Sequence, residues 1–140
     1  TREYSIGGTM DIVYSFTRGE ETLAVEIGKT HPKLDAWLTT DKCDRWMILT
    51  SENPWGEEFP TFVNKQRTQV LRTQLLQSDL PWVEGLGEAD GFPSETVFLI
   101  WGLTLEESAL LALEMSQTAV VTGLVGGYAE VISLHDGGGE

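Results

Sequence analysis

Six polar residues carry the chemistry that this sequence could perform, because each stands close to the end of an apolar segment. A carboxylate at a strand start can bind a cation, side-chain amides and a hydroxyl can form directed hydrogen bonds, and an arginine can bind a carboxylate. The six residues are Ser51, Asn53, Asn64, Arg67, Glu95 and Gln117. Each of them also has a purely structural interpretation.

Glu95 marks the start of one predicted strand, and Gln117 stands just before another. Glu95 is a candidate site carboxylate, although an acidic residue at a strand start is more often a solvated surface group. Gln117 is a candidate hydrogen-bonding residue of the same site. Its structural alternatives are to cap the preceding helix or to pair with backbone.

Asn64 and Arg67 are three residues apart, so they share one face of a predicted helix. Arg67 falls within the apolar stripe of that helix, where an unpaired guanidinium is costly to bury. It therefore needs a carboxylate partner, which could be Glu95, an acid of another subunit or a ligand carboxylate. The structural alternative is an ion pair that serves the fold alone.

The stretch around Glu95 predicts a strand, a helix and a second strand. Residues 95–101 are apolar, β-branched or aromatic except at the ends, which suits a central strand buried on both faces. Thr104 and Glu107 form the capping box of a helix that runs to about Ser116, with Leu105, Ala109, Ala112 and Leu113 at helical spacing. A further strand begins at residues 119–121.

The rest of the chain supplies the elements that must position these residues. Patterning predicts strands at 9–17 and 21–27 around a hairpin turn, a short helix from about residue 30, a strand at 46–50 and a helix at 62–77. The stripe of this second helix comprises Val63, Arg67, Val70, Leu71, Gln74 and Leu75. A short strand at 82–84, a loop at 88–93 and a last strand at 128–134 complete the prediction.

From residue 46 the predicted order is strand, helix, strand, strand, helix, strand, which is the split βαβ or ferredoxin-like arrangement. We therefore predict an α+β fold of one domain, residues 1–140. An N-terminal β-hairpin and short helix (1–44) precede a ferredoxin-like α-β sandwich (45–134) and a disordered tail (135–140). In the usual sheet order 4-1-3-2, the first strand lies antiparallel between the third and fourth. Ser51, Asn53, Asn64, Glu95 and Gln117 then converge at one end of the sheet.

Composition limits the partners. The formal net charge of −13 repels nucleic acid and attracts small cations, so we expect no nucleic-acid partner. The acids are scattered rather than arrayed in runs, which ranks an acidic DNA mimic last. Cys43 is the single cysteine, which excludes an internal disulfide and a cysteine-based metal site. His31 and His135 are isolated, so we expect no metal and no cofactor. No apolar run approaches the roughly twenty residues that span a bilayer, so we expect no membrane partner and a cytoplasmic location.

Over almost its whole length the chain resembles an uncharacterised bacterial and phage domain family. The shared motifs are Ile27-Gly28, His31-Pro32-x-Leu34, Thr50-Ser51-Glu52-Asn53-Pro54, Asn64-x-x-Arg67, Glu95-x-Val97-Phe98-Leu99, Gly102 and Gln117. The core is similar to phage S-adenosylmethionine (SAM) degrading enzymes, through an Asn/Arg helix, a Glu entering a central strand and a Gln after the second helix. Two of the motifs depart from the pattern: Met115-Ser116 replaces an aromatic-Gly pair, and Glu52 replaces a common aromatic residue.

The resemblance implies a homotrimer of ferredoxin-like units, akin to the P-II (GlnB-like) signalling proteins, with active sites at subunit interfaces. A lone sheet of this kind leaves edges and one open face, which association covers. The implied reaction is cleavage of SAM to methylthioadenosine and L-homoserine lactone, by which a phage counters host defence because it starves the host methylation and restriction systems. Glu95 and Gln117 are the implied catalytic residues, with Ser51, Asn53, Asn64 and Arg67 as substrate-binding residues.

SAM lyase chemistry needs no metal or covalent nucleophile, because the carboxylate of the substrate attacks its own γ-carbon and expels a neutral thioether. In this assignment Glu95 binds the substrate ammonium and Gln117 forms a hydrogen bond nearby. No convincing general base is evident at this end of the predicted sheet. The alternative function is a non-catalytic P-II-like trimer that binds an adenosyl metabolite or a nucleotide.

Overall fold

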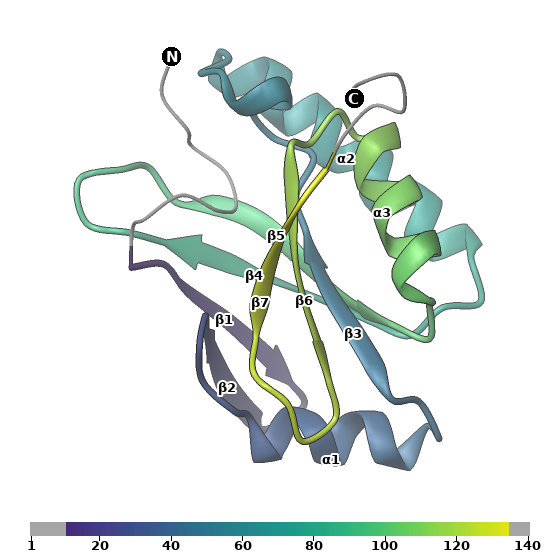
Figure 1. The fold of residues 1–140 in the computed structure, drawn as a ribbon. Coiled ribbons are helices and arrows are strands. Elements are labelled where there is room, and N and C mark those ends of the chain that lie inside the picture. Colours follow the sequence, from purple (N-terminus) through teal and green to yellow (C-terminus); the bar gives the residue numbers. More distant parts are fainter. Residues whose placement is uncertain (1–10, 135–140) are drawn as a thin grey trace.

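The computed structural model describes residues 11–134, and this part of the chain is a mixed α+β protein with a curled antiparallel sheet of seven strands and three α-helices (Figure 1). The strands are β1 (Val13–Arg18), β2 (Glu21–Glu26), β3 (Arg45–Leu49), β4 (Trp82–Glu88), β5 (Glu95–Trp101), β6 (Ala119–Leu124) and β7 (Glu130–Ser133). The helices are α1 (Pro32–Thr40), α2 (Thr61–Gln77) and α3 (Leu105–Glu114), and Pro54–Gly56 forms a 3-10 turn.

The strands lie in the order β2-β1-β4-β5-β3-β6-β7, and neighbours pair antiparallel throughout. β3 lies between β5 and β6, antiparallel to both, as the sequence predicted. The hairpin of β1 and β2 extends the sheet beyond β4, and β7 extends it beyond β6. The N-terminal segment is therefore part of the same sheet as the core.

The sheet is curled, so that the two strands at its edges, β2 and β7, come close to each other at one end. The backbone N–H of Gly28, just after β2, donates to the carbonyl of Ala129, just before β7, at 2.8 Å, and Ala129 N donates to the carbonyl of Lys29 at 3.1 Å. In Figure 1, α1 crosses the lower end of this curled sheet, while α2 and α3 lie together on its other side. The curl makes one concave face and one face that carries the two longer helices.

Each face of the sheet has its own core. Trp46, Ile48 and Leu99 pack on the concave face with residues of β1, β2 and α1. Met47 and Phe98, which alternate with them along β3 and β5, pack on the other face with residues of α2 and α3. The central strands are thus buried on both sides, as predicted for residues 95–101. Burial of each such side chain stabilises the fold by roughly 1.5–3 kcal/mol.

The concave face corrects the expectation of an open side. That expectation treated residues 1–44 as an addition to a core with one bare face. In the structure Trp37 and Leu38 of α1 and Phe16 of β1 are buried against that face. This chain therefore covers the face with its own N-terminal segment.

β4 extends beyond the predicted strand at 82–84, to Glu88. The prediction ended early because Gly85 and Gly87 interrupt the alternating pattern typical of a strand. A Cβ at Gly85 would lie 2.1 Å from the carbonyl oxygen of Ser15 and 2.5 Å from the Phe16 ring. Glycine ordinarily weakens a strand, but here the neighbouring strand approaches closely and covers the gap with an aromatic side chain. The last strand is shorter than predicted, at Glu130–Ser133 rather than 128–134.

The predicted stripe of α2 was right at Leu71 and Leu75, which are buried, and wrong at Val70 and Gln74. Val70 is 56% exposed, and Gln74 is exposed as well. The buried residues of the helix are Asn64, Thr68, Leu71 and Leu75. The N-terminal half of this buried face is polar because it lies against a loop rich in polar groups and not against the apolar core. In α3 the capping box of Thr104 and Glu107 is present as predicted, whereas Leu105 is 40% exposed and Ser108 is buried.

Three sequence predictions fall outside the described residues. They are the start of the first strand at residue 9, the disordered tail at 135–140 and the position of His135. Within residues 11–134, the helices are too short or too polar to cross a bilayer.

Candidate functional site

The predicted site residues meet at one end of the sheet, where four segments come together. These segments are the loop after β3, the first turns of α2, the start of β5 and the link from α3 to β6. Hydrogen bonds between residues more than forty positions apart connect them. The convergence predicted from the order of the elements is confirmed.

Asn53 and Asn64 fix the loop after β3 to the start of α2. Asn53 donates its backbone N–H to the side-chain carbonyl of Asn64 at 2.8 Å, and the Asn64 amide nitrogen donates back to Asn53 Oδ1 at 3.0 Å. The same Asn53 oxygen accepts the backbone N–H of Phe59 at 2.9 Å. These hydrogen bonds fix the orientation of both side chains, and so they also fix the direction in which the side-chain nitrogen Asn53 Nδ2 points.

That nitrogen points at Glu95. Asn53 Nδ2 donates to Glu95 Oε2 at 3.0 Å, and the Glu95 residue is only 7% exposed. Burial is the main reason that the pKa of Glu95 is raised to about 8; the Asn53 hydrogen bond opposes the shift, and the nearby Glu52 adds to it. At a pKa of about 8, the Glu95 carboxyl is mostly protonated at neutral pH.

Glu52 is the residue that sequence reasoning missed. Its Oε2 accepts the backbone N–H of Thr96 at 2.8 Å, and burial raises the pKa of its carboxyl. Glu52 is therefore held by the residue next to Glu95, while Glu95 is held by Asn53, the residue next to Glu52. An acidic residue in a loop rich in turn-forming residues is normally expected to be solvated. The only sequence signal for Glu52 was that it replaces an aromatic residue of the family pattern.

A pocket of about 800 Å³ lies over this pair of carboxyl groups. That volume is within the range of small-molecule sites. Three acids line it, Glu52, Glu58 and Glu95, against two basic residues, Lys65 and Arg72. Three of the six predicted residues also line it, namely Asn53, Asn64 and Glu95.

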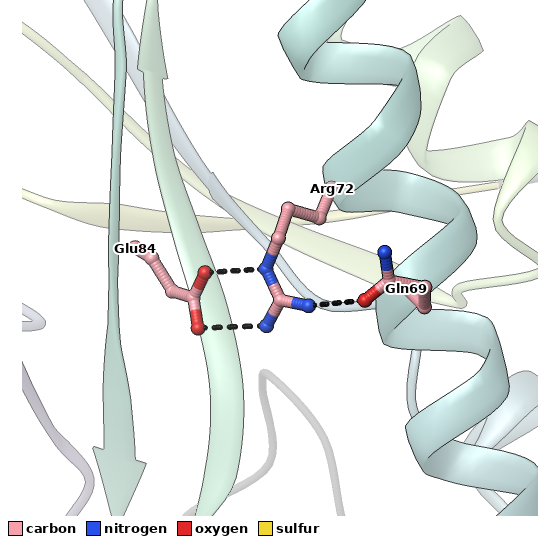
Figure 2. A network of polar contacts seen from close by, with 3 residues as sticks. All are labelled: Gln69, Arg72 and Glu84. Atoms are coloured by element: carbon pink, nitrogen blue, oxygen red, sulfur yellow. Dashed lines mark hydrogen bonds and ion pairs between the residues drawn. The ribbon is translucent and has the colours of Figure 1, made fainter.

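Arg72 forms a fixed part of the pocket wall (Figure 2). Its guanidinium binds both carboxylate oxygens of Glu84 on β4, at 2.8 and 2.9 Å, and donates to the side chain of Gln69 at 2.6 Å. The hydrogen bonds to Glu84 raise the Arg72 pKa. Because the pair is exposed, it contributes no more than about 1 kcal/mol to stability. The main effect of the ion pair is to connect α2 to β4 and so to hold Arg72 in place at the pocket.

Among residues 11–134, Arg67 binds backbone carbonyls and not Glu95, the partner within the chain that the sequence analysis considered. Its Nε donates to the carbonyl of Ser51 at 2.6 Å, and one terminal nitrogen donates to the carbonyl of Met115 at 2.7 Å. Burial lowers the Arg67 pKa. Backbone carbonyls satisfy the guanidinium in place of an acid, so Arg67 joins the loop after β3 to the end of α3.

Gln117 and Ser51 lie behind this loop and not in the pocket. Gln117 Nε2 donates to the carbonyls of Glu52 and Met115, each at 3.2 Å. Within residues 11–134, Gln117 Oε1 and Ser51 Oγ are buried without a hydrogen-bond partner. Ser51, Arg67 and Gln117 therefore brace the site from behind, while the other three candidates face it.

The backbone around the site is strained at three residues. Asn53, Trp55 and Ser116 have φ angles of 48°, 59° and 61°, in the left-handed region that non-glycine residues rarely adopt. A 2.7 Å hydrogen bond from Trp55 N to the Ser116 carbonyl joins the two segments. Such conformations cost on the order of 1–3 kcal/mol each and cluster at functional sites. This observation agrees with a site at this end of the sheet.

Metal ligands are not grouped in the part of the chain that the structure describes: no three His, Cys, Asp or Glu side chains there are arranged to hold an ion together. His31 lies far from the pocket in the fold, where its Nε2 accepts the backbone N–H of Glu26 at 3.1 Å. Its ring packs edge-on against Trp46.

Comparisons with known proteins give one match. Residues 49–120 match the model of a family described as "Protein of unknown function (DUF3293)". No curated protein and no solved structure matches the chain. The matched region runs from the end of β3 through α3 to the start of β6, so it contains all six predicted site residues and Glu52. Since the match covers about half of its residues, the chain belongs to the DUF3293 family.

Proposed function

We propose that this protein is a SAM lyase that cleaves SAM to methylthioadenosine and L-homoserine lactone. The observation that carries the proposal is the pair of neighbouring carboxyl groups, the buried Glu95 and the partly buried Glu52, at a pocket of about 800 Å³. SAM carries a sulfonium and an ammonium, and an acidic pocket of this size suits such a ligand. If a phage encodes the protein, it would act in the host cytoplasm by depleting the methyl donor of restriction systems.

The strand order supports a ferredoxin-like core of the P-II type. β6-β3-β5-β4 is the order 4-1-3-2 when the strands from β3 onward are numbered one to four. α2 and α3 pack on the same face of these strands, as the split βαβ arrangement requires. The hairpin, α1 and β7 are additions to this core.

In the proposed reaction, an oxygen of the substrate carboxylate attacks the γ-carbon of the methionine chain. The carbon–oxygen bond forms as the carbon–sulfur bond breaks, and the electron pair of the latter leaves on sulfur as a neutral thioether. Glu95, with Glu52 beside it, binds the ammonium and keeps the chain folded. Effective molarity in such oriented intramolecular reactions is worth up to roughly 7–11 kcal/mol, so positioning supplies much of the catalysis.

The remaining residues act on Glu95 and the loop. Asn53 orients the Glu95 carboxyl, and Asn64 orients Asn53. Arg67 and Gln117 hold the loop through its carbonyls at Ser51 and Glu52. We therefore assign Gln117 a positioning role in place of direct contact with the substrate.

The alternative is a non-catalytic module that binds an adenosyl metabolite or a nucleotide. One observation favours it: Arg67 and Gln117 both direct their donors at backbone carbonyls. The pocket then offers fewer directed polar groups than the resemblance implies. Both functions use the same carboxyl pair, so a reaction assay must separate them.

Incubation of SAM with the purified protein should yield methylthioadenosine and homoserine lactone, resolved by liquid chromatography and mass spectrometry. The matched control is Glu95→Gln at equal concentration. Intact SAM together with calorimetric binding would identify a binding module. Intact SAM without binding would refute the proposal.

We also propose a homotrimer with the pockets at subunit interfaces. Trp55 and Phe62, 62% and 70% exposed, neighbour the pocket residues in sequence and offer apolar surface for a partner. Light scattering should give about three times the chain mass of 15.5 kDa. Phe62→Arg should reduce this mass, whereas Tyr128→Arg, a control at a 63% exposed site on the β6–β7 connection, should not. A monomeric wild type would exclude shared sites.

A further inference from the structure

Glu95 has a second group of neighbours besides those at the main pocket. A small cavity of about 10 Å³ lies among them, and its lining includes Glu95, Tyr14 of β1 and Glu88 of β4. This volume is about the space that one water molecule needs. Glu95 thus lines both the main pocket and a small cavity that reaches the N-terminal hairpin.

The register of the sheet brings Tyr14 to this position. Tyr14 is paired with Gly87 of β4, and Gly87 is paired with Glu95 of β5, so the three residues lie in one row across adjacent strands. Residues paired in this way share a face of the sheet. The middle position has no side chain, and a Cβ at Gly87 would lie 3.1 Å from the Tyr14 ring atoms Cδ1 and Cε1. The tyrosine ring therefore covers Gly87 on the row that leads to Glu95.

The hydroxyl of Tyr14 is otherwise unused. Tyr14 is 1% exposed, and its Oη has no hydrogen-bond partner among residues 11–134. A buried phenol normally has such a partner, because an unsatisfied one costs about 1–3 kcal/mol. Burial raises the Tyr14 pKa, and the charge of Glu95 raises it further, so the hydroxyl stays protonated and available as a donor.

We propose that Tyr14 is a positioning residue for Glu95: its hydroxyl donates a hydrogen bond, through one water in the small cavity, to the Glu95 carboxylate. The hydrogen bond stabilises the charged form of the carboxyl and directs its other oxygen to the pocket. The inference concerns the ionisation of Glu95 and holds for any cationic ligand, so it does not depend on lyase activity. It also makes the N-terminal hairpin, which lies outside the matched residues 49–120, part of the site.

Several charged or titratable groups face Glu95 and must stay unchanged in the test. On the side of the small cavity they are Tyr14 from β1 and Glu88 from β4. From the loop after β3, from α2 and across the pocket they are Glu52, Glu58, Lys65 and Arg72. Of these groups only the tyrosine hydroxyl can donate to the carboxyl from the cavity side. Its removal is therefore the specific perturbation.

Tyr14→Phe should raise the pKa of Glu95 by roughly one unit, since it removes a hydrogen bond to the charged form. The readout is the carboxyl carbon resonance of Glu95 in protein labelled with ¹³C at glutamate Cδ, assigned by its loss in Glu95→Gln. The phenyl ring keeps the packing over Gly87. Tyr128→Phe removes an exposed hydroxyl elsewhere and should leave the titration unchanged.

Incorporation of 3,5-difluorotyrosine at position 14 provides a test in the opposite direction. Fluorination strengthens the phenol as a donor, so the pKa of Glu95 should fall relative to wild type. A structural role for Tyr14 predicts no such opposite shifts. An unchanged or lowered Glu95 pKa in Tyr14→Phe, or an unchanged one in the fluorinated protein, would overturn the proposal.

Discussion

Replacement of Glu95 by glutamine should lower SAM turnover roughly 10²-fold or more, because loss of one member of a buried, hydrogen-bonded charge pair costs about 2–5 kcal/mol. Glutamine has nearly the same shape, and its carbonyl oxygen can still accept the hydrogen bond from Asn53. We therefore expect the fold to be retained, and only the negative charge that we propose binds the substrate ammonium to be lost. Steady-state kinetics of the two proteins measures the effect, and equal turnover would remove Glu95 from the site.

The same variant should become more stable than wild type in alkaline solution. The pKa of Glu95 is about 8 in the folded protein against an ordinary value of 4.5, so between these pH values the folded state holds a proton that the unfolded state lacks. The free energy of unfolding of the wild type therefore falls as pH rises from 4.5 to about 8, then levels off with respect to this group. The loss is on the order of a few kcal/mol.

Glu95→Gln lacks this titration, so its melting temperature should match that of the wild type near pH 5 and exceed it by several degrees above pH 8. Thermal unfolding followed by circular dichroism across this range provides the measurement. Glu130→Gln, which removes an exposed carboxylate on β7, serves as the control. Parallel pH slopes for wild type and Glu95→Gln would mean that the carboxyl is already ionised at neutral pH.

Function should follow pH in the opposite sense to stability. A cationic ligand requires the ionised carboxylate, so kcat/KM should rise with pH up to about 8 and then level off. Binding at pH 7 should also release a proton, which calorimetry in buffers of different ionisation enthalpy detects. These two observations connect the burial of Glu95 with its proposed role.

Much of the core was predictable because its patterns are local. Residues 95–101 read as a strand buried on both faces, and Thr104 with Glu107 marked the start of α3. The alternation of strands and helices then implied that Asn53, Asn64 and Glu95 converge, and they do. Local patterning and one topological rule were sufficient for this part.

The remaining features depend on contacts between distant segments. The length of β4 was underestimated because Gly85 and Gly87 fit a strand only where the rings of Phe16 and Tyr14 on the neighbouring strand cover them. Glu95 was the wrong partner for Arg67, because the guanidinium binds the backbone carbonyls of Ser51 and Met115, and a sequence does not show where backbone carbonyls point. Local patterning cannot predict such contacts, because the sequence around one partner carries no information about which distant residue will pack against it.

A lyase and a hydrolase share methylthioadenosine as a product, so this product does not distinguish them. The structure adds one group that bears on the difference, a carboxyl that could act as a general base for water. The sequence showed no general base, but a pKa of about 8 places the Glu95 carboxyl in the range where it can accept a proton from water. General-base assistance contributes roughly 10²–10⁴-fold. A tethered nucleophile reaches effective molarities of roughly 10⁵–10⁸ M. The carboxylate of the substrate should therefore react before water does.

We accordingly expect homoserine lactone as the first product in oxygen-18 water, without label when the reaction is quenched early. Lactone that opens later carries the label in its carboxylate, because water adds to the carbonyl carbon. Authentic lactone incubated in the same buffer provides the control for the rate of this opening. Homoserine labelled in its side-chain hydroxyl at the earliest times would mean that water attacks the γ-carbon. In that case Glu95 or Glu52 would be the base, because among the described residues these are the two acids at the pocket whose pKa is raised by burial.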